Sequence, residues 1–214
     1  MLLSRRHDFL FVHVPKAAGT SMERALAKAC EPTPNRGPLQ RPIVRALRRT
    51  PLARPLGLWR DLPGHSRASE LRRALPPEIW DASFKFAFVR HPLDRLVSQY
   101  WFLLQSPDHR RHGRVAALGS FSAFVRYEAG RGRFTQLDHL ESEDGAPLLD
   151  FVGRFERLEQ DWSAVERRLG LEAPLPRANA SRHAPWREHY DDATLALALD
   201  VWGAEIERLE YTVD

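Results

Sequence analysis

The stretch Phe9–Lys28, FLFVHVPKAAGTSMERALAK, decides the fold. Its first residues are aromatic or aliphatic, which is typical of a buried strand, and its alanine-rich second half is typical of a helix. Pro15 ends the predicted strand, and Gly19 lets the backbone turn tightly. Thr20 or Ser21 can then cap the helix. A strand, a turn of small residues and a helix N-terminus form an anion cradle, because backbone N–H groups and the helix dipole converge there.

Lys16 adds a positive charge to this cradle, so the expected ligand is a phosphate or a sulfate. In a Walker A loop, G-x-x-x-x-G-K-[ST], the lysine follows the last glycine, whereas here Lys16 comes three residues before Gly19. No later segment is a convincing apolar run ending in the aspartate that holds magnesium in nucleoside triphosphatases. The spacing therefore argues against a Walker A loop. Taken alone, it also fits an ordinary connection between a strand and a helix.

The composition indicates a soluble globular protein. The 214 residues suit one domain over 1–214, and the hydrophobic and charged fractions of 43% and 28% are ordinary. The net charge of +4 suits anionic ligands, or reflects the composition of the source organism. Cys30 is the only cysteine, which excludes an intrachain disulfide and favours a reducing compartment. With no signal segment and no apolar window near the length of a membrane span, we expect a cytoplasmic protein.

An insertion at about residues 31–63 interrupts this pattern. It contains seven prolines and seven arginines. We expect it to be largely irregular, because each proline removes a backbone donor and restricts the residue before it. It is either a basic lid for an acidic acceptor or a solvated loop.

A second strand followed by a helix is predicted over 84–104. Arg90 ends the strand, Pro92 suits the first turn of the helix, and Ser98 comes eight residues after Arg90. Arginine offers a planar fork of donors to phosphate oxygens, and serine adds one hydroxyl. Taken alone, the pair also fits a salt bridge at the strand end and a surface hydroxyl.

Both segments resemble sulfotransferases, most closely the carbohydrate-type family, sulfotransferase family 2. The order Pro-Lys-x-x-Gly-Thr-Ser is similar to the family's phosphosulfate loop, and Phe86–Tyr100, FAFVRHPLDRLVSQY, is similar to the signature that binds the 3′-phosphate. The resemblance implies a P-loop-like fold, 3′-phosphoadenosine 5′-phosphosulfate (PAPS) as co-substrate, and no metal. In one departure, His91 stands where the family usually has Asn or Asp, and we expect it to cap the helix less well.

The resemblance also implies roles for individual residues. His65, in a Gly-His segment before a predicted helix that Ser66 can cap, would be the catalytic base, since a neutral imidazole can take a hydroxyl proton near pH 7. Lys16 would neutralise charge on the leaving oxygen. Donor-binding residues would be Lys16, Ala17, Ala18, Gly19, Thr20, Ser21, Arg90 and Ser98, with Ser181 and Arg182 as secondary candidates. Arg133 and Gln136 would contact the acceptor, although the Asn and His that usually precede this glutamine are absent.

Strands near 9–14, 84–90 and 149–155 alternate with helices, which predicts a three-layer α/β domain with a mainly parallel sheet. Ligands of such sheets bind at the carboxyl ends of the strands, where Lys16 and Arg90 are expected. The predicted function is sulfuryl transfer from PAPS to a hydroxyl, expected on a saccharide.

Three alternatives remain open. The first is an ATP-dependent phosphotransferase of P-loop type, and the second is a noncatalytic nucleotide- or glycan-binding module. The third is a nucleic-acid binder that uses the arginine-rich insertion. No aromatic platform or reading helix accompanies those arginines, so no nucleic-acid partner is expected.

Overall fold

The computed structural model of the chain describes residues 1–30, 63–132, 135–176 and 184–213. They divide into two compact units, which we describe separately. Unit 1 is Met1–Val89 with Leu137–Pro176, and unit 2 is Arg90–Gln136 with Arg177–Asp214. The single domain expected over 1–214 contains both units and stays a prediction. Apart from its last residue, the insertion predicted at 31–63 lies outside the described residues.

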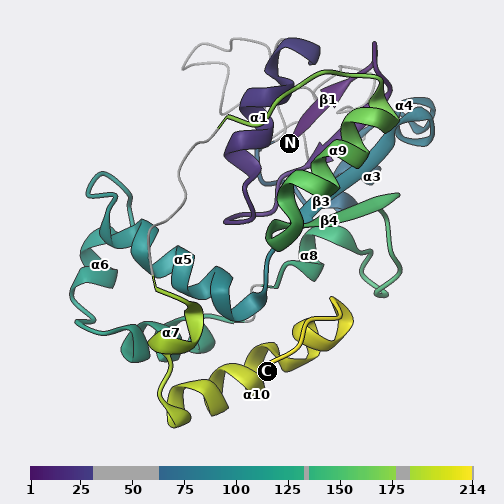
Figure 1. Cartoon of the computed structure of the whole chain (residues 1–214). Helices are drawn as coiled ribbons and strands as arrows, with labels where there is room; N and C mark the ends of the chain where they lie inside the picture. The colour runs from purple at the N-terminus through teal and green to yellow at the C-terminus, as the bar shows by residue number, and fades with distance from the viewer. Residues whose placement is uncertain (31–62, 133–134, 177–183, 214) are drawn as a thin grey trace, which may run out of the picture. The chain divides into compact units, whose positions relative to one another are not determined.

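Unit 1 is built on a four-stranded sheet in the order β1-β2-β3-β4 (Figure 1). The strands are β1 (Leu2–Ser4), β2 (Phe9–Val12), β3 (Phe84–Val89) and β4 (Phe151–Arg154). The last three are parallel to one another, which confirms the predicted mainly parallel sheet. β1 pairs antiparallel with β2 and was not predicted, since three residues are too few to show a strand pattern.

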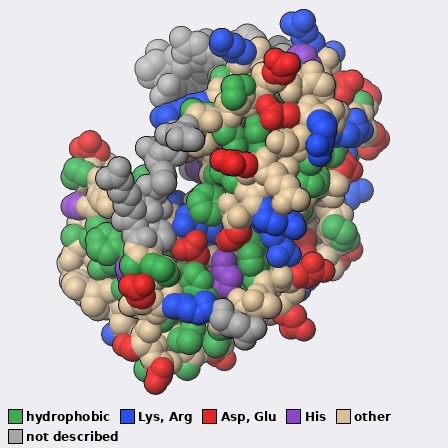
Figure 2. Space-filling model, in the orientation of Figure 1, with side chains coloured by type: hydrophobic (Ala, Val, Ile, Leu, Met, Phe, Trp, Pro, Cys, Tyr) green, Lys and Arg blue, Asp and Glu red, His purple; other side chains and the backbone are tan. Residues whose placement is uncertain are grey.

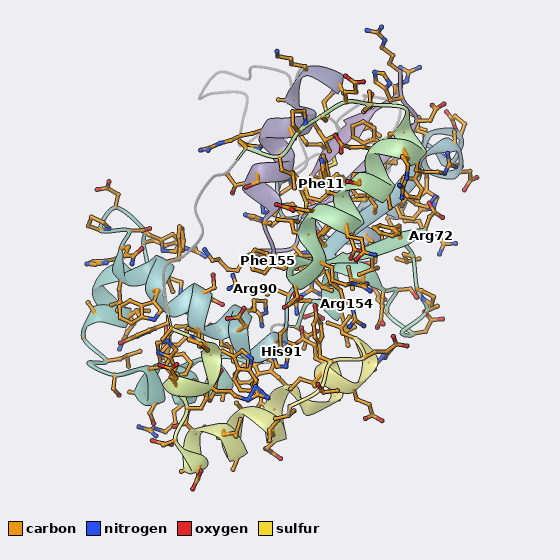
Figure 3. All side chains as sticks on the ribbon, viewed as in Figure 1. Phe11, Arg72, Arg90, His91, Arg154 and Phe155 are labelled. Atoms are coloured by element: carbon orange, nitrogen blue, oxygen red, sulfur yellow. The ribbon has the colours of Figure 1, made fainter. Side chains whose placement is uncertain are left out.

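Helices cover both faces of this sheet. Alternate residues of β2 and β3 point to one face, where they form a core with α1 (Gly19–Leu26) and α9 (Leu158–Leu169). The buried members of this core are Phe9, Phe11, Met22, Leu26, Phe86, Phe88, Trp162, Val165 and Ala173 (Phe11 is labelled in Figure 3). On the other face, Lys85 contacts α4 (Pro77–Ala82), which follows α3 (Ala68–Ala74). These three layers confirm the predicted α/β architecture.

The expected cap of α3 was wrong. Ser66 does not cap α3, because its hydroxyl donates to the carbonyl of Pro63 at 3.0 Å. Arg67 is the N-cap, and Glu70 Oε2 accepts from its backbone N–H at 3.0 Å. α3 ends at Ala74, and Pro77 begins α4, as the fixed φ of proline allows. A short α8 (Leu137–Leu140) returns the chain to this unit.

Unit 2 is helical. It contains α5 (Pro92–Leu104), α6 (His112–Ala116), α7 (Phe121–Gly130) and α10 (Asp192–Arg208). Side chains cap two of these helices: Ser120 Oγ accepts from Ala123 N at 3.2 Å at the start of α7, and Asp191 Oδ1 accepts from Thr194 N at 2.7 Å at the start of α10. The polar stretch 106–119 includes α6, whose Val115 is completely buried against α5.

Three 3₁₀ helices complete the secondary structure of the described residues, at Ala27–Ala29, Phe155–Arg157 and Trp186–His189. None of the helices in the described ranges combines the length and the apolar character that a membrane crossing needs.

A buried lysine joins the start of β3 to the chain before β4. Lys85 is 9% exposed, and its Nζ donates to the carbonyl of Ser83 at 2.6 Å. Asp150 Oδ2 lies 3.0 Å from Lys85 Nζ and also accepts from the Lys85 backbone N–H at 2.7 Å. Both interactions hold β3 and β4 in register at their amino ends.

Lys85→Met is expected to lower the free energy of unfolding by about 1–3 kcal/mol, because the Ser83 carbonyl and the Asp150 carboxylate lose a buried charged donor. Urea denaturation followed by circular dichroism measures the change. Lys28→Met, at an exposed lysine, is the matched control and should stay within about 0.5 kcal/mol of the original protein. Equal midpoints for the two variants would contradict this account of Lys85.

Candidate functional site

The turn between β2 and α1 is tight because two residues other than glycine adopt left-handed backbone angles. Lys16 has φ 71° and Ala18 has φ 62°. Gly19 is not among the residues with positive φ, so the predicted reason for this glycine was wrong. A left-handed angle costs a residue with a Cβ about 1–2 kcal/mol. Strain of this kind is typical of sites that bind ligands.

Gly19 is required by a close contact instead. A Cβ built at this position would lie 2.2 Å from both Nε2 and Cδ2 of the His13 ring. No side chain fits in that space, so any residue larger than glycine must displace the ring or the start of α1. The glycine therefore allows the imidazole of His13 to lie directly on the helix backbone.

The N-terminus of α1 has no side-chain cap. Ala18 is the N-cap residue, and neither Thr20 nor Ser21 takes the predicted capping role. The first turn contains no acidic residue. The first N–H groups of a helix have no carbonyl partner within it, and they carry the positive end of the helix dipole. With the half-buried Lys16 beside it, this turn fits a phosphate or a sulfate.

His65 contacts this turn through His13. His65 lies in an exposed turn before α3, and its ring centroid is 4.3 Å from that of His13, with the rings at 73°. His13 Nδ1 lies 2.9 Å from Glu23 Oε1 of α1, and since a carboxylate only accepts, the imidazole donates. The ring of His13 thus lies between His65 and the backbone of Gly19.

The sequence analysis did not identify His13 and Glu23 as site residues. A signal was present, because His13 directly follows the last residue of β2, and Glu23 lies one helical turn after Gly19. Their mutual contact depends on how α1 packs against the strand end, which no spacing rule reveals.

Burial and the neighbouring His13 have the largest effects on the protonation of His65 in unit 1. Partial burial of its ring lowers the pKa of His65, and the positive charge of His13 lowers it further, whereas a hydrogen bond to the His13 backbone raises it. The net effect is a lowered pKa, which keeps the imidazole neutral at pH 7. For Glu23, burial raises the pKa, but the hydrogen bond from His13 and its charge outweigh burial and lower it. Glu23 is therefore ionised when it accepts from His13.

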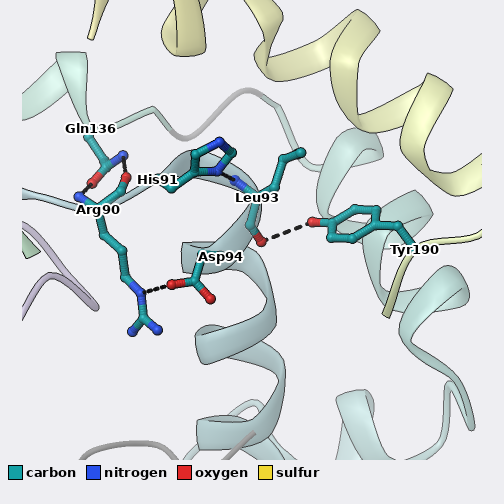
Figure 4. Close-up of polar contacts among 6 residues, drawn as sticks. All are labelled: Arg90, His91, Leu93, Asp94, Gln136 and Tyr190. Atoms are coloured by element: carbon teal, nitrogen blue, oxygen red, sulfur yellow. Dashed lines mark hydrogen bonds and ion pairs between the residues drawn. The ribbon is translucent and has the colours of Figure 1, made fainter. Parts of the chain in front are cut away.

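In unit 2, Arg90 directly follows the last residue of β3, and an ion pair orients its side chain. Arg90 is 5% exposed, and its Nε donates to Asp94 Oδ2 at 2.6 Å (Figure 4). Asp94 and Ser98 are four residues apart in α5 and share one face of the helix. Asp94 thus holds the guanidinium over the face that carries Ser98, which is 2% exposed.

His91 caps α5, and the expectation that it does so less well than Asn or Asp stays a prediction. Its Nδ1 accepts from Leu93 N at 3.2 Å, as the side chain of Asn or Asp would (Figure 4). Its Nε2 lies 2.8 Å from the carbonyl oxygen of Thr212 and so carries the proton. Because the two partners require opposite roles, the ring is held as a single neutral tautomer. Tyr190 Oη secures the same helix start by donating to the Leu93 carbonyl at 3.0 Å.

Gln136 is not available to an acceptor. It is completely buried, and its Oε1 accepts from the Arg90 backbone N–H at 2.9 Å. Its Nε2 donates to the Arg90 carbonyl at 2.8 Å and to Glu205 Oε1 at 2.9 Å. Both amide hydrogens are used, so this placement argues against the predicted acceptor contact. Gln136 instead fixes the backbone of Arg90.

Three of the predicted site residues cannot be placed in the site. Arg133, Ser181 and Arg182 lie outside the described residues, so their proposed contacts stay predictions. In the part of the chain that the structure describes, no group of three or more His, Cys, Asp and Glu side chains is arranged to hold a metal ion.

Opposite stability effects are expected at adjacent positions of the turn. Gly19→Ala should lower the free energy of unfolding by about 1–3 kcal/mol, because the new Cβ overlaps the His13 ring. Ala18→Gly relieves the left-handed strain in the folded protein, but it also increases the conformational entropy of the unfolded chain. The free energy of unfolding should therefore stay the same or rise by up to about 1 kcal/mol. Urea midpoints compare the two. If Ala18→Gly is destabilised and Gly19→Ala is not, the explanation of this turn by the Gly19–His13 contact and the left-handed Ala18 is wrong.

Comparison with known proteins agrees with this geometry. A model of the sulfotransferase family matches residues 1–212, which include the turn at Lys16, His65 and the start of α5. Comparison with curated proteins gives no significant match. The family match extends over nearly the whole chain and spans both units. The chain therefore belongs to the sulfotransferase family.

Proposed function

We propose that this sulfotransferase takes its sulfuryl group from PAPS and transfers it to a hydroxyl, with a saccharide as the expected acceptor. Membership of the family makes the chain a transferase of the sulfotransferase kind. The observation that carries the proposal is the turn at Lys16. There the helix N-terminus has no side-chain cap, and the imidazole of His13 lies between this N-terminus and His65. A candidate anion cradle and a candidate base thus occur together in unit 1.

The 5′-phosphosulfate binds at the start of α1 in this proposal. The backbone amides of residues 18–20 donate to its oxygens, since the Ser21 N–H already donates to the carbonyl of Ala18 at 3.0 Å. The Lys16 ammonium supplies a full positive charge. Two left-handed residues shape the turn, and the Gly19–His13 contact fixes it, so these donors are in place before the nucleotide arrives. Donors of this kind suit an anion and require no metal bridge.

The 3′-phosphate is assigned to Arg90 and Ser98. This assignment rests on the resemblance and on unit 2 alone, where Asp94 orients the guanidinium and Gln136 fixes the Arg90 backbone. An arginine has five N–H donors, and Asp94 Oδ2 engages the one on Nε. Orientation by a carboxylate lowers the entropy that the arginine side chain loses when a phosphate binds.

The reaction then needs one proton transfer and one displacement at sulfur. A ring nitrogen of His65 takes the proton of the acceptor hydroxyl, whose oxygen forms a bond to sulfur. The bond from sulfur to the bridging oxygen breaks, and its electron pair stays on the departing phosphate. Lys16 neutralises the charge that grows on that oxygen. Its place in a fixed turn keeps the lysine aligned with the displacement.

The nucleic-acid alternative gains no support from the visible surface. On the face drawn in Figure 2, the Lys and Arg side chains of the described residues are interspersed with Asp and Glu. A nucleic-acid backbone favours a continuous basic stripe.

Incubation with PAPS labelled in the sulfuryl group, together with panels of saccharides and small hydroxyl compounds, tests the proposal. The expected result is labelled product from at least one saccharide. A parallel incubation with ATP labelled in the γ-phosphate should give none. Label transferred from ATP would support the phosphotransferase instead. Tight binding of 3′-phosphoadenosine 5′-phosphate (PAP) without transfer to any acceptor would support the noncatalytic module.

Lys16→Ala is expected to lower turnover by about a hundredfold or more, because one charge-stabilising donor at the leaving oxygen is lost. The initial rate of label transfer at saturating donor measures the effect. Lys28→Ala, which removes an exposed lysine from the 3₁₀ helix after α1, is the control and should keep full activity. If both variants are equally active, Lys16 has no part in the transfer.

His65→Ala is expected to keep PAP binding within about twofold but to lose turnover by about 10²–10⁴-fold, the range for a general base. Because the pKa of His65 is lowered, the neutral base persists below the usual histidine pKa of about 6.5. In the unmodified protein kcat/KM should therefore decline only as the pH falls through this lowered pKa. Calorimetric titration with PAP and a pH series of rates provide the two measurements. Unchanged turnover in His65→Ala would remove the base assignment.

A further inference from the structure

The side chains of Glu23, His13 and His65 form a continuous series in unit 1. Glu23 Oε1 accepts from His13 Nδ1 at 2.9 Å, and the His13 ring lies edge to face against His65 at 4.3 Å. The mechanism above uses His65 alone. An inference about the other two residues therefore rests on the proposed function and extends it.

The His13 ring is held on three sides. It is 6% exposed and lies just beyond the end of β2. Glu23 fixes Nδ1, and the backbone of Gly19 lies so close that a Cβ there would be 2.2 Å from Nε2. His65 covers a third side. A ring confined in this way cannot turn without breaking the Glu23 contact or moving α1.

His65, in contrast, lies in an exposed turn outside any helix or strand. Its imidazole has a hydrogen bond to the His13 backbone that favours the protonated form. The backbone group must be the carbonyl, since only an acceptor stabilises the imidazolium. We therefore expect one ring nitrogen of His65 to donate to the His13 carbonyl, which leaves the lone pair of the neutral ring on the other nitrogen. A general base needs that arrangement.

We propose that His13, held by Glu23, is a positioning residue that orients the imidazole of His65 and selects the tautomer whose second nitrogen takes the acceptor proton. The ring of His13 supplies the surface against which His65 rests. The backbone carbonyl of His13 selects the tautomer of the His65 ring. Because the same ring lies on Gly19, the base is placed relative to the helix N-terminus that binds the anion.

The charges around His65 come from three groups. The positive charges of His13 and of the Met1 amino group lower the pKa of His65, and the Glu23 carboxylate raises it. The Met1 nitrogen lies 3.9 Å from Glu23 Oε1. Partial burial of the ring lowers the pKa more than any of these charges. Removing the His13 ring relieves both burial and repulsion, so the pKa of His65 should rise.

The first experiment uses the unmodified protein without any ligand. Nitrogen-15 NMR of the histidine rings, with His65→Ala to assign the signals, reports the tautomer of His65 near neutral pH. We expect a single tautomer, with one nitrogen protonated and the other carrying the lone pair. A mixture of both tautomers, as in a freely exposed histidine, overturns the proposal whatever the variants do.

The second experiment compares His13→Asn with His7→Asn. Asparagine can still donate to Glu23, but it lacks the ring that contacts His65. His7 lies in the turn between β1 and β2, at the opposite end of β2, and is the control. In His13→Asn the NMR titration midpoint of His65 should move to higher pH, and the acidic limb of the kcat/KM profile should move the same way. Turnover should fall by up to about a hundredfold, as expected for a misplaced base. His7→Asn should change none of these quantities.

The outcomes separate this inference from the proposed function. If no acceptor is sulfated but the His65 tautomer and midpoint behave as described, the proposed function fails and the positioning by His13 stands. If sulfation occurs and a folded His13→Asn leaves the midpoint and the acidic limb of His65 unchanged, the positioning role is wrong. Should His13→Asn not fold, the tautomer measured in the unmodified protein decides.

Discussion

The contact between the imidazole of His13 and the backbone of Gly19 is the constraint on which unit 1 depends. It leaves no room for a side chain at the first residue of α1, so the helix begins directly against the His13 ring, just beyond the end of β2. The intervening turn must then be short, and Lys16 and Ala18 take up left-handed angles. The same ring also reaches Glu23 and His65. One contact thus fixes the anion cradle and relates it to the candidate base.

Unit 2 follows the same principle with different groups. Arg90, the residue proposed to bind the 3′-phosphate, is held through its own backbone by Gln136, and through its guanidinium by Asp94. Glu205, 1% exposed, accepts from Gln136 in turn. In both units a buried polar group therefore supports the residue that would meet the ligand. Such support keeps donors in place before binding, which reduces the reorganisation that a reaction requires.

Much of this arrangement was predictable because it depends on local signals. The alternation of aromatic residues in β2 and β3, the helical spacing after Pro92, and the caps Ser120 and Asp191 all act over a few residues. The family resemblance came from equally local patterns around Lys16 and Arg90. Where prediction failed, the cause was a competing partner. The carbonyl of Pro63, only three residues earlier, takes the Ser66 hydroxyl away from α3, and Gln136, 46 residues from Arg90, binds the Arg90 backbone.

By itself, the sequence determined the order of strands and helices, the parallel sheet and the two positively charged segments, since hydrophobic periodicity and turn chemistry are properties of neighbouring residues. Only the tertiary structure decided why position 19 is glycine, why His91 is an adequate cap, and which side chains support His65 and Arg90. Those outcomes arise from groups that meet in space, whether they are six residues apart, as His13 and Gly19 are, or 121 residues apart, as His91 and Thr212 are. Their contacts are set by how helices pack on the sheet or on one another, and packing leaves no periodic trace in the chain.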